Sequence, residues 1–149
     1  MSAAGGEQAK SFGGKLRLSV VTPERSVYEG AVDAVVVPGH DGEVAFFPGH
    51  APYVGLLGVG ELRFHAAAGG TQHHLLAGGV VQVVDDTVSV LAETVLPVAG
   101  LSVDKARTVL EAARALPATD DASEAVRAHA QLVARGKLRL ATRAGAAAH

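Results

Sequence analysis

The chain contains no cysteine. This absence excludes disulfide bonds, thiolate zinc sites and a catalytic thiol, and it fits a reducing compartment. The nucleophilic and metal-binding chemistry that remains belongs to histidines, carboxylates and hydroxyl groups. Any function that depends on thiol chemistry is therefore ruled out.

Long hydrophobic runs are also missing. No apolar stretch approaches the roughly 18 residues that cross a bilayer, because Asp33, Glu61 or a glycine-rich turn interrupts each of them. Residues 1–14 lack the apolar core of a secretion signal and the arginine-rich pattern of a mitochondrial import peptide. We expect a flexible extension over residues 1–14, a cytoplasmic location and no direct insertion into a membrane.

Two motifs of catalytic and nucleotide-binding sites are absent as well. The chain has no Gly-Lys-Ser or Gly-Lys-Thr sequence, which argues against a phosphate-binding loop. It also has no serine or cysteine elbow of the kind that hydrolases use to present a nucleophile. The sequence therefore favours a binding or structural role over catalysis.

The composition is that of a globular protein with an uneven charge distribution. A chain of 149 residues with 48% hydrophobic content should bury roughly 70% of its unfolded surface, as one medium domain or two small ones. Residues 15–100 hold four basic and nine acidic side chains, whereas residues 101–149 hold eight basic and five acidic ones. We expect the two parts to have different partners.

Short strands are indicated between residues 15 and 98. Leu16, Leu18 and Val20 alternate with Arg17 and Ser19, which is the period of a strand with one buried face. Further apolar segments are separated by turn residues at positions 38–39, 41–42, 58, 69–70, 78–79 and 85–86. We expect an antiparallel β-sandwich domain of about ten short strands over residues 15–98.

The pattern becomes helical after residue 98. Ser102 is expected to cap a first helix, and Asp104 in its first turn complements the helix dipole. Pro117 and the turn residues that follow separate this helix from a second one, expected from residue 124 to about residue 141. We expect an α-helical hairpin domain over residues 99–149 with a short disordered end, and hence an α+β chain.

Two turn-dense clusters flank a very short strand in the first half of the chain. They read Pro38-Gly39-His40-Asp41-Gly42-Glu43 and Phe46-Phe47-Pro48-Gly49-His50-Ala51-Pro52. Together with residues 21–25, 76–83 and 88–94, these clusters resemble in order and spacing the epsilon subunit of the rotary F-type ATP synthases. The resemblance extends from Lys15 to about Leu140.

The resemblance implies a non-catalytic subunit of the central stalk. Such a subunit would link the gamma subunit to the membrane rotor ring of a proton- or sodium-driven synthase, without a cofactor of its own. It would lie at the cytoplasmic face of the bacterial inner membrane, attached through the complex. By matching positions, the ring contact falls on Gly39, His40, Asp41, Gly42 and Glu43, with Glu43 the best single candidate. The gamma contact falls on Pro48, Gly49, His50, Ala51, Gly78 and Gly79.

The resemblance also implies an alternative, a stand-alone ATP-sensing module. In some bacterial members of the family, a motif on the first tail helix binds ATP with help from arginines on the second helix. Asp104 and Arg107 match that motif, whereas Val103 and Thr108 depart from it. The candidate arginines of the second helix are Arg127 and Arg135. Without a ligand, Asp104, Arg107, Glu111 and Arg114 would form a solvent-exposed row of charge pairs.

The second helix is strongly basic. Arg127, Arg135, Lys137 and Arg139 follow its last acidic residue, Glu124. A positive helix favours an acidic partner surface. The resemblance implies that the hairpin extends along gamma toward the alpha/beta catalytic head and inhibits ATP hydrolysis.

Other interpretations have less support. His40, Asp41, Glu43 and His50 have the side chains of a zinc or manganese site, but turn and loop roles explain them better, the resemblance favours a subunit contact, and we expect no metal. A hydrolase built on His50 and Asp41 lacks the elbow motif. His73 and its neighbour His74 point to opposite faces of a strand, so they do not readily share an ion. The basic helix has no aromatic side chain for stacking, so nucleic acid is not an expected partner.

Overall fold

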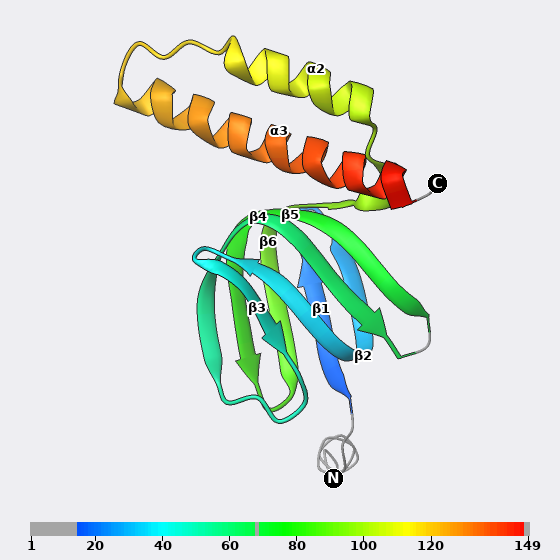
Figure 1. Cartoon of the computed structure of the whole chain (residues 1–149). Coiled ribbons are helices and arrows are strands. Elements are labelled where there is room, and N and C mark those ends of the chain that lie inside the picture. The colour runs from blue at the N-terminus through cyan, green and yellow to red at the C-terminus, as the bar shows by residue number, and fades with distance from the viewer. Residues whose placement is uncertain (1–14, 68, 148–149) are drawn as a thin grey trace. The chain divides into compact units, whose positions relative to one another are not determined.

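The computed structural model describes residues 15–147 except residue 68. It consists of two compact units, one through Val95 and one from Leu96 onward. The described residues form six strands, one short 3-10 helix and two α-helices, as Figure 1 shows. A β-sandwich followed by a helical hairpin is therefore confirmed. The extension expected over residues 1–14 lies outside the described residues.

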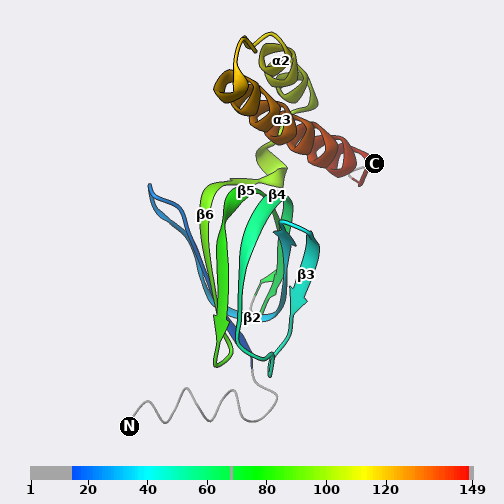
Figure 2. The ribbon, with the colours of Figure 1, turned by 90° about the vertical axis from the view of Figure 1, so that its left-hand side faces the viewer.

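The first unit is a single sheet folded into two layers. Its strands are β1 (Leu16–Val21), β2 (Ser26–Gly39), β3 (Gly42–Phe46), β4 (Tyr53–Ala66), β5 (Gly70–Val84) and β6 (Thr87–Pro97). They are hydrogen-bonded in the order β1-β6-β5-β4-β2-β3, and an additional pairing of β1 with β2 closes the sheet on itself. In Figure 2, β6 and β3 lie on opposite sides of this unit. The expected antiparallel arrangement has one exception, because β1 and β6 run parallel.

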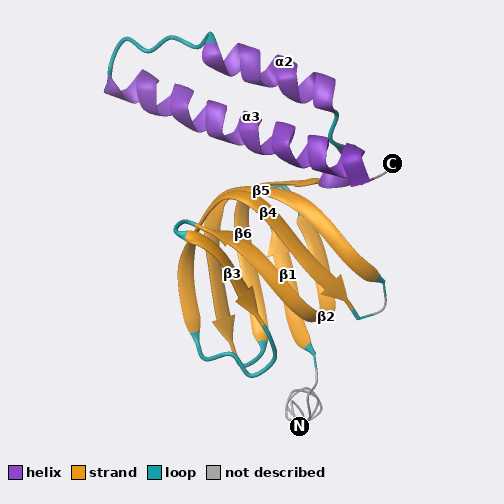
Figure 3. Cartoon of the chain, viewed as in Figure 1, coloured by secondary structure: helices purple, strands orange, loops and turns teal. Residues whose placement is uncertain are grey.

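The number of strands is lower than expected. Six strands occur among the described residues instead of about ten, because three pairs of short segments are continuous. β2 runs through Gly30, β4 through Gly58, and β5 through Gly78 and Gly79. A glycine inside an apolar run marks either the end of a strand or a bend in it. Here these glycines lie within strands, and Figure 3 draws β2, β4 and β5 as long strands.

β4 and β5 change the face that they turn toward the core. The core residues of β4 include Leu57 and then Leu62, and those of β5 include Leu76 and then Val81. The two positions of each pair differ by five, an odd number, which breaks the period of two of a regular strand. The two strands therefore pass from one layer to the other near Gly58 and Gly78.

The glycine pair of β5 allows a very close approach to β6. Gly78 and Gly79 have φ angles of +77° and +128°, which L-residues with a side chain rarely adopt. A Cβ on Gly79 would lie 2.1 Å from the carbonyl oxygen of Leu91 and 2.8 Å from the Cα of Ala92. A side chain at this position would force the two strands apart.

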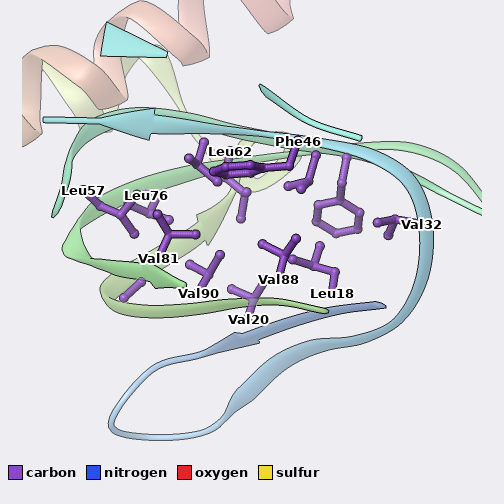
Figure 4. Packing of buried hydrophobic residues seen from close by; sticks show 14 of the residues in the cluster. Leu18, Val20, Val32, Phe46, Leu57, Leu62, Leu76, Val81, Val88 and Val90 are labelled. Carbon is purple, nitrogen blue, oxygen red and sulfur yellow. The ribbon is translucent and has the colours of Figure 1, made fainter. Parts of the chain in front are cut away.

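The core lies between the two layers. Phe46 of the short strand β3 is fully buried there, and its neighbours come from the other five strands. Figure 4 shows side chains of β1 and β6 facing those of β3 and β4, including Leu18, Val20, Val88, Val90, Phe46 and Leu62. Each fully buried side chain of this size contributes about 1.5–3 kcal/mol of transfer free energy.

The second unit is the helical hairpin. It contains η1 (Val98–Gly100), α2 (Val103–Arg114) and α3 (Asp121–Ala147). The hydroxyl of Ser102 accepts a hydrogen bond from the backbone N–H of Lys105 at 3.3 Å, so the expected cap of the first helix is confirmed. None of the described helices is long and apolar enough to cross a bilayer.

The second helix is longer than expected. It begins at Asp121 instead of residue 124 and ends at Ala147 instead of about residue 141. The cause at its start is Asp120, whose carboxylate accepts a hydrogen bond from the backbone N–H of Ser123 at 2.8 Å. Asp120 thus caps the helix, and this bond holds the pKa of its carboxyl below the ordinary value.

The two helices pack on each other through small side chains. The buried side chains of α2 and α3 include only two leucines, and the full set is Ala106, Leu110, Ala113, Ala134, Leu140 and Ala141. Alanine allows close packing but removes little apolar area from water. The hairpin therefore gains less from burial than the sandwich does.

Candidate functional site

The β2–β3 turn holds the residues expected to meet the rotor ring. Gly39 pairs with Gly42, which leaves His40 and Asp41 as a two-residue turn. Gly42 has a φ of +133°, a value that favours glycine. The side chains of His40 and Asp41 are 71% and 101% exposed, and His40 Nδ1 lies 3.4 Å from Asp41 Oδ1. The tip of the hairpin is therefore polar and open to a partner.

Glu43 is engaged within its own chain. Arg63 donates from Nη1 to Glu43 Oε2 at 2.8 Å and from Nη2 to Glu43 Oε1 at 3.2 Å. Arg63 Nη1 also lies 3.3 Å from Glu61 Oε1, and Glu61 Oε2 lies 2.8 Å from His73 Nδ1. The hydrogen bond with Glu43 is the main cause of the raised pKa of Arg63. Glu43 thus belongs to a charge network that reaches β5.

The loop between β3 and β4 contains most of the residues expected to meet gamma. The backbone N–H of Gly49 donates to Asp86 Oδ1 at 2.7 Å, so the loop is anchored to the β5–β6 turn. The N–H of His50 donates to the carbonyl of Phe47 at 3.2 Å, and Gly49 has a φ of +89°. Pro48 lies within this tight turn.

The ring of His50 packs inside the loop. It makes an edge contact with Phe46 at a centroid distance of 5.0 Å and with Tyr53 at 6.2 Å. Its Nδ1 lies 2.7 Å from the carbonyl oxygen of Ala51, so Nδ1 carries a proton and donates it to that carbonyl. These contacts give His50 a structural role as a loop cap.

The two turn-dense clusters are not brought together. β3 has five residues and separates the β2–β3 turn from the loop by about 17 Å. His40 and Asp41 therefore lie at one end of this strand and His50 at the other. Within residues 15–147, the structure contains no group of three or more histidines and carboxylates arranged to hold a metal ion. The quartet considered as a metal site is not assembled.

A row of exposed apolar side chains was not anticipated from the sequence. Leu56 pairs with Val80 across β4 and β5, and Leu91 pairs with Val21 across β6 and β1. Val80 also lies beside Leu91, because its neighbour Gly79 contacts the carbonyl of Leu91. Four strands thus contribute one apolar residue each to a row, in which Val21 is only partly exposed.

Two further side chains extend this row toward the β3–β4 loop. Val54 is 74% exposed and Leu56 65% exposed, whereas Leu91 is 54% exposed and Val84 39% exposed. We call the six residues the apolar face: Val21, Val54, Leu56, Val80, Val84 and Leu91. Exposed apolar side chains that gather on one side of a sheet are typical of an interaction site.

A shallow depression joins the polar turn to the apolar face. It has a volume of about 390 Å³ and is lined by residues 39–44 on one side and residues 53–56 on the other. Val54 and Leu56 belong to both the depression and the apolar face. The polar turn and the apolar face are therefore adjacent on the first unit, although the turn and the β3–β4 loop are not.

The two adjacent histidines of β5 have different environments. His73 is exposed and bonded to Glu61, whereas His74 is 8% exposed and stacks on Phe64 with the ring planes 9° apart. Within the described part of the chain, His74 Nδ1 is buried and has no hydrogen-bond partner. Burial is the main cause of the lowered pKa of His74, followed by the charges of His73 and Arg25.

The candidate nucleotide-binding residues lie on both helices of the hairpin. Asp104 and Arg107 are exposed on α2, and Arg127 and Arg135 are carried by α3. A depression of about 390 Å³ on α3 is lined by residues 121, 124, 125, 127, 128 and 131. It contains only one of the four candidates, and its lining includes two carboxylates that oppose a phosphate group.

The arginines of α3 form a stripe. Arg127, Arg135 and Arg139 follow at multiples of four residues, and Arg135 Nη2 donates to Gln131 Oε1 at 2.9 Å. Residues four apart share one face of a helix. Lys137 lies on the same helix outside this stripe. The helix thus presents a line of positive charge.

The charge pairs expected on α2 do not form. In the described part of the hairpin, no ion pair joins Asp104, Arg107, Glu111 and Arg114. The exposed charges of α2 are therefore not neutralised by one another. They remain open to solvent.

Comparison with known proteins agrees with this architecture. The family described as "ATP synthase, Delta/Epsilon chain, beta-sandwich domain" matches residues 15–98. The sandwich, its polar turn and the hairpin thus define a subunit of an ATP synthase. The epsilon chain of Rhodopirellula baltica is 37% identical over 124 residues, or 83% of this chain and 96% of that protein. The chain belongs to the ATP synthase epsilon chain family, which supplies a non-catalytic subunit.

Other similar proteins support the same assignment. The epsilon chain of Syntrophobacter fumaroxidans is 39% identical over 120 residues, or 79% of this chain and 88% of that protein. A chain of the Euglena gracilis mitochondrial ATP synthase, solved with OSCP, F1 and c-ring, has a TM-score of 0.72 at 22% identity, over 91% of this chain and 82% of that one. A chain of the Tetrahymena thermophila central stalk and c-ring has a TM-score of 0.64 at 16% identity, over 87% and 96%. At these low identities, the two solved structures show similarity of fold alone.

Proposed function

We propose that this chain is the central-stalk subunit that fastens gamma to the membrane rotor ring of a proton- or sodium-driven ATP synthase. It is attached through the complex to the cytoplasmic face of a bacterial inner membrane. The observation that carries the proposal is the apolar face of the sandwich, which lies beside a polar turn on the same unit. Two unlike adjacent surfaces fit a subunit that joins two unlike partners.

The apolar face is the proposed gamma contact. Two of its side chains, Leu56 and Leu91, are more than half exposed, and their burial against a partner is favourable by about 25 cal/mol per Å². The loop with Pro48, Gly49, His50 and Ala51 borders the same face, because Gly49 is bonded to Asp86 at the end of β5. Gly78 and Gly79 contribute indirectly, since they set the spacing of β5 and β6 beneath Leu91.

The β2–β3 turn is the proposed ring contact. The polar loops of a rotor ring call for hydrogen-bonding side chains that are already exposed and ordered. His40 and Asp41 meet this requirement at the tip, with Gly39, Gly42 and Glu43 completing the hairpin. The solved structures of similar fold come from assemblies that contain a c-ring.

The gamma contact is tested by substitutions in the apolar face. Leu56→Ser and Val80→Ser should each weaken the binding of gamma about tenfold or more, because both residues lie at the centre of the row. Val126→Ser is the matched control, since Val126 is a 63% exposed valine on α3. Equal affinities for the wild-type chain and for both substituted chains would contradict the proposal.

We further propose that the hairpin inhibits ATP hydrolysis. The arginine stripe of α3 fits an acidic segment of the catalytic head, and the thin alanine-rich interface lets the helices part from each other. ATP hydrolysis by the catalytic head with gamma is measured against increasing full-length chain and against a truncation that ends at Val98. Only the full-length chain should suppress the rate. Equal suppression by both chains would show that the helices are not the brake.

A further inference from the structure

We propose that Arg63 positions the ring contact. It holds the β2–β3 hairpin through Glu43, and the carboxylate that reaches the ring belongs to Asp41. This inference rests on the proposed function, because it takes the β2–β3 turn as the part of the chain that meets the ring. It assigns different roles to two carboxylates that lie two residues apart.

The backbone ladder beside this turn is interrupted. Val36 of β2 pairs with Arg63 of β4, but the next pair joins Gly39 with Leu57, so the register shifts and the regular pairing is broken between them. Pro38 lies in this gap and has no N–H to donate. Main-chain hydrogen bonds alone therefore hold this end of β2 weakly to the rest of the sheet.

Two contacts compensate for the gap. The backbone N–H of His40 donates to the carbonyl of Leu56 at 2.9 Å. The side chain of Arg63 on β4 also crosses β2 and donates two hydrogen bonds, of 2.8 and 3.2 Å, to Glu43 on β3. β3 is the last strand of the order and pairs only with β2. Arg63 thus ties an edge strand to β4, and a two-point arginine–carboxylate pair fixes direction as well as distance.

The same geometry separates the roles of the two carboxylates. Both oxygens of Glu43 accept a hydrogen bond from Arg63, so this carboxylate is already oriented by the guanidinium and its charge is balanced within the chain. The side chain of Asp41 is 101% exposed at the tip of the turn, and its contact with His40 Nδ1 is a weak one at 3.4 Å. Asp41 can reach a partner without any internal rearrangement.

The experiment measures the affinity of the full-length chain for an assembly of the ring and gamma from the same organism. Arg63→Gln and Glu43→Gln should each weaken binding about two- to fivefold, and the double variant should be no weaker, because both changes remove one interaction. Arg63→Lys keeps the charge but loses the two-point geometry, so it should lie between Arg63→Gln and the wild type. Lys15→Gln removes a surface pair with Asp33 elsewhere in the sheet and should leave the affinity unchanged.

A charge exchange separates positioning from direct contact. Arg63→Glu and Glu43→Arg should each weaken ring binding, and the double exchange should recover most of the affinity if Glu43 acts only as an anchor. Recovery of the melting temperature without recovery of ring binding would overturn the inference, because Glu43 would then touch the ring itself. Unchanged binding of Arg63→Gln, beside weakened binding of Asp41→Asn, would also overturn it.

A failure of the proposed function gives a different pattern. Amide exchange of His40 and Gly42 should become faster in Arg63→Gln, which reports the loosened turn in the isolated chain. If exchange accelerates while Asp41→Asn and every other turn variant bind the ring normally, the turn is not the ring contact. The proposed ring contact and the inference that rests on it would then both be wrong.

Discussion

Gly79 is the residue whose replacement the fold tolerates least. Its φ of +128° and the 2.1 Å that would separate a Cβ from the carbonyl oxygen of Leu91 leave no room for a side chain. Gly79→Ala should lower the free energy of unfolding by at least about 2 kcal/mol. Gly100→Ala is the control, because nothing lies within 4 Å of a Cβ built at Gly100. Chemical denaturation of both variants measures the difference, and equal stability would contradict the packing described for β5 and β6.

His74 should make the stability of the chain depend on pH. Its pKa in the folded chain lies below the ordinary value of 6.5 because it is buried. The unfolded chain therefore binds the proton more readily, so stability falls as the pH drops through about 6.5 and is unaffected above it. His74→Phe keeps the stacking on Phe64 and removes the titration.

The measurement compares melting temperatures between about pH 7.5 and about pH 5.5. The decrease on acidification should be smaller in His74→Phe than in the wild-type chain. His129→Gln alters an exposed histidine of α3 and should keep the wild-type pH dependence. The same dependence in His74→Phe and the wild type would show that His74 is not the responsible group.

The sequence indicated some individual site residues but not their partners. The exposed polar turn at His40 and Asp41 followed from turn chemistry, because glycines flank these two residues. The pairing of Glu43 with Arg63 did not, since the two lie 20 residues apart and meet only when β2 lies between their strands. The row of Leu56, Val80 and Leu91 depends on strand register in the same way. The alternation of side chains along a strand could have predicted that Leu56 and Leu91 point outward, because each is adjacent in sequence to an apolar residue that faces the core.

Among the elements, α3 depends on its first turn. The carboxylate of Asp120 accepts from the N–H of Ser123, and the Ser123 hydroxyl accepts from the N–H groups of Thr119 and Asp120 at 2.9 and 3.0 Å. Asp120→Ala should lower the melting temperature of the helices by a few degrees, whereas Asp120→Asn should lower it less, because asparagine also caps helices. Far-UV circular dichroism checks this order. Identical melting of the two variants would contradict the capping role.

The strands show why element boundaries were harder to predict than element types. A glycine such as Gly58 or Gly78 signals a break in regular structure, and the sequence alone does not distinguish a turn from a bend. The structure uses both, with Gly49 in a turn and Gly78 inside a strand. Tertiary pairing along β4 and β5 decides between them. The first helix was closer to expectation, because Ser102 caps its start and Pro117 follows its end, whereas the second helix is longer than expected at both ends.

At the scale of the whole molecule, the two units should differ in stability. The sandwich buries large side chains from six strands, whereas the buried side chains of the hairpin are mostly alanines. Helical circular dichroism should therefore fall at a lower temperature than the signal of the strands. The truncation that ends at Val98 should lack the first transition and retain the second. A single coincident transition in the full-length chain would contradict this expectation.

Continuous strands also determine how the sandwich responds to load. β2, β4 and β5 each run through both layers, and the bend of β2 is visible in Figure 4. Sliding one layer past the other would therefore deform the covalent backbone of three strands, rather than only separate side chains. In a subunit of a rotary machine, the sandwich would therefore resist shear between its two layers. A torque applied to one layer would then reach the other layer with little internal deformation.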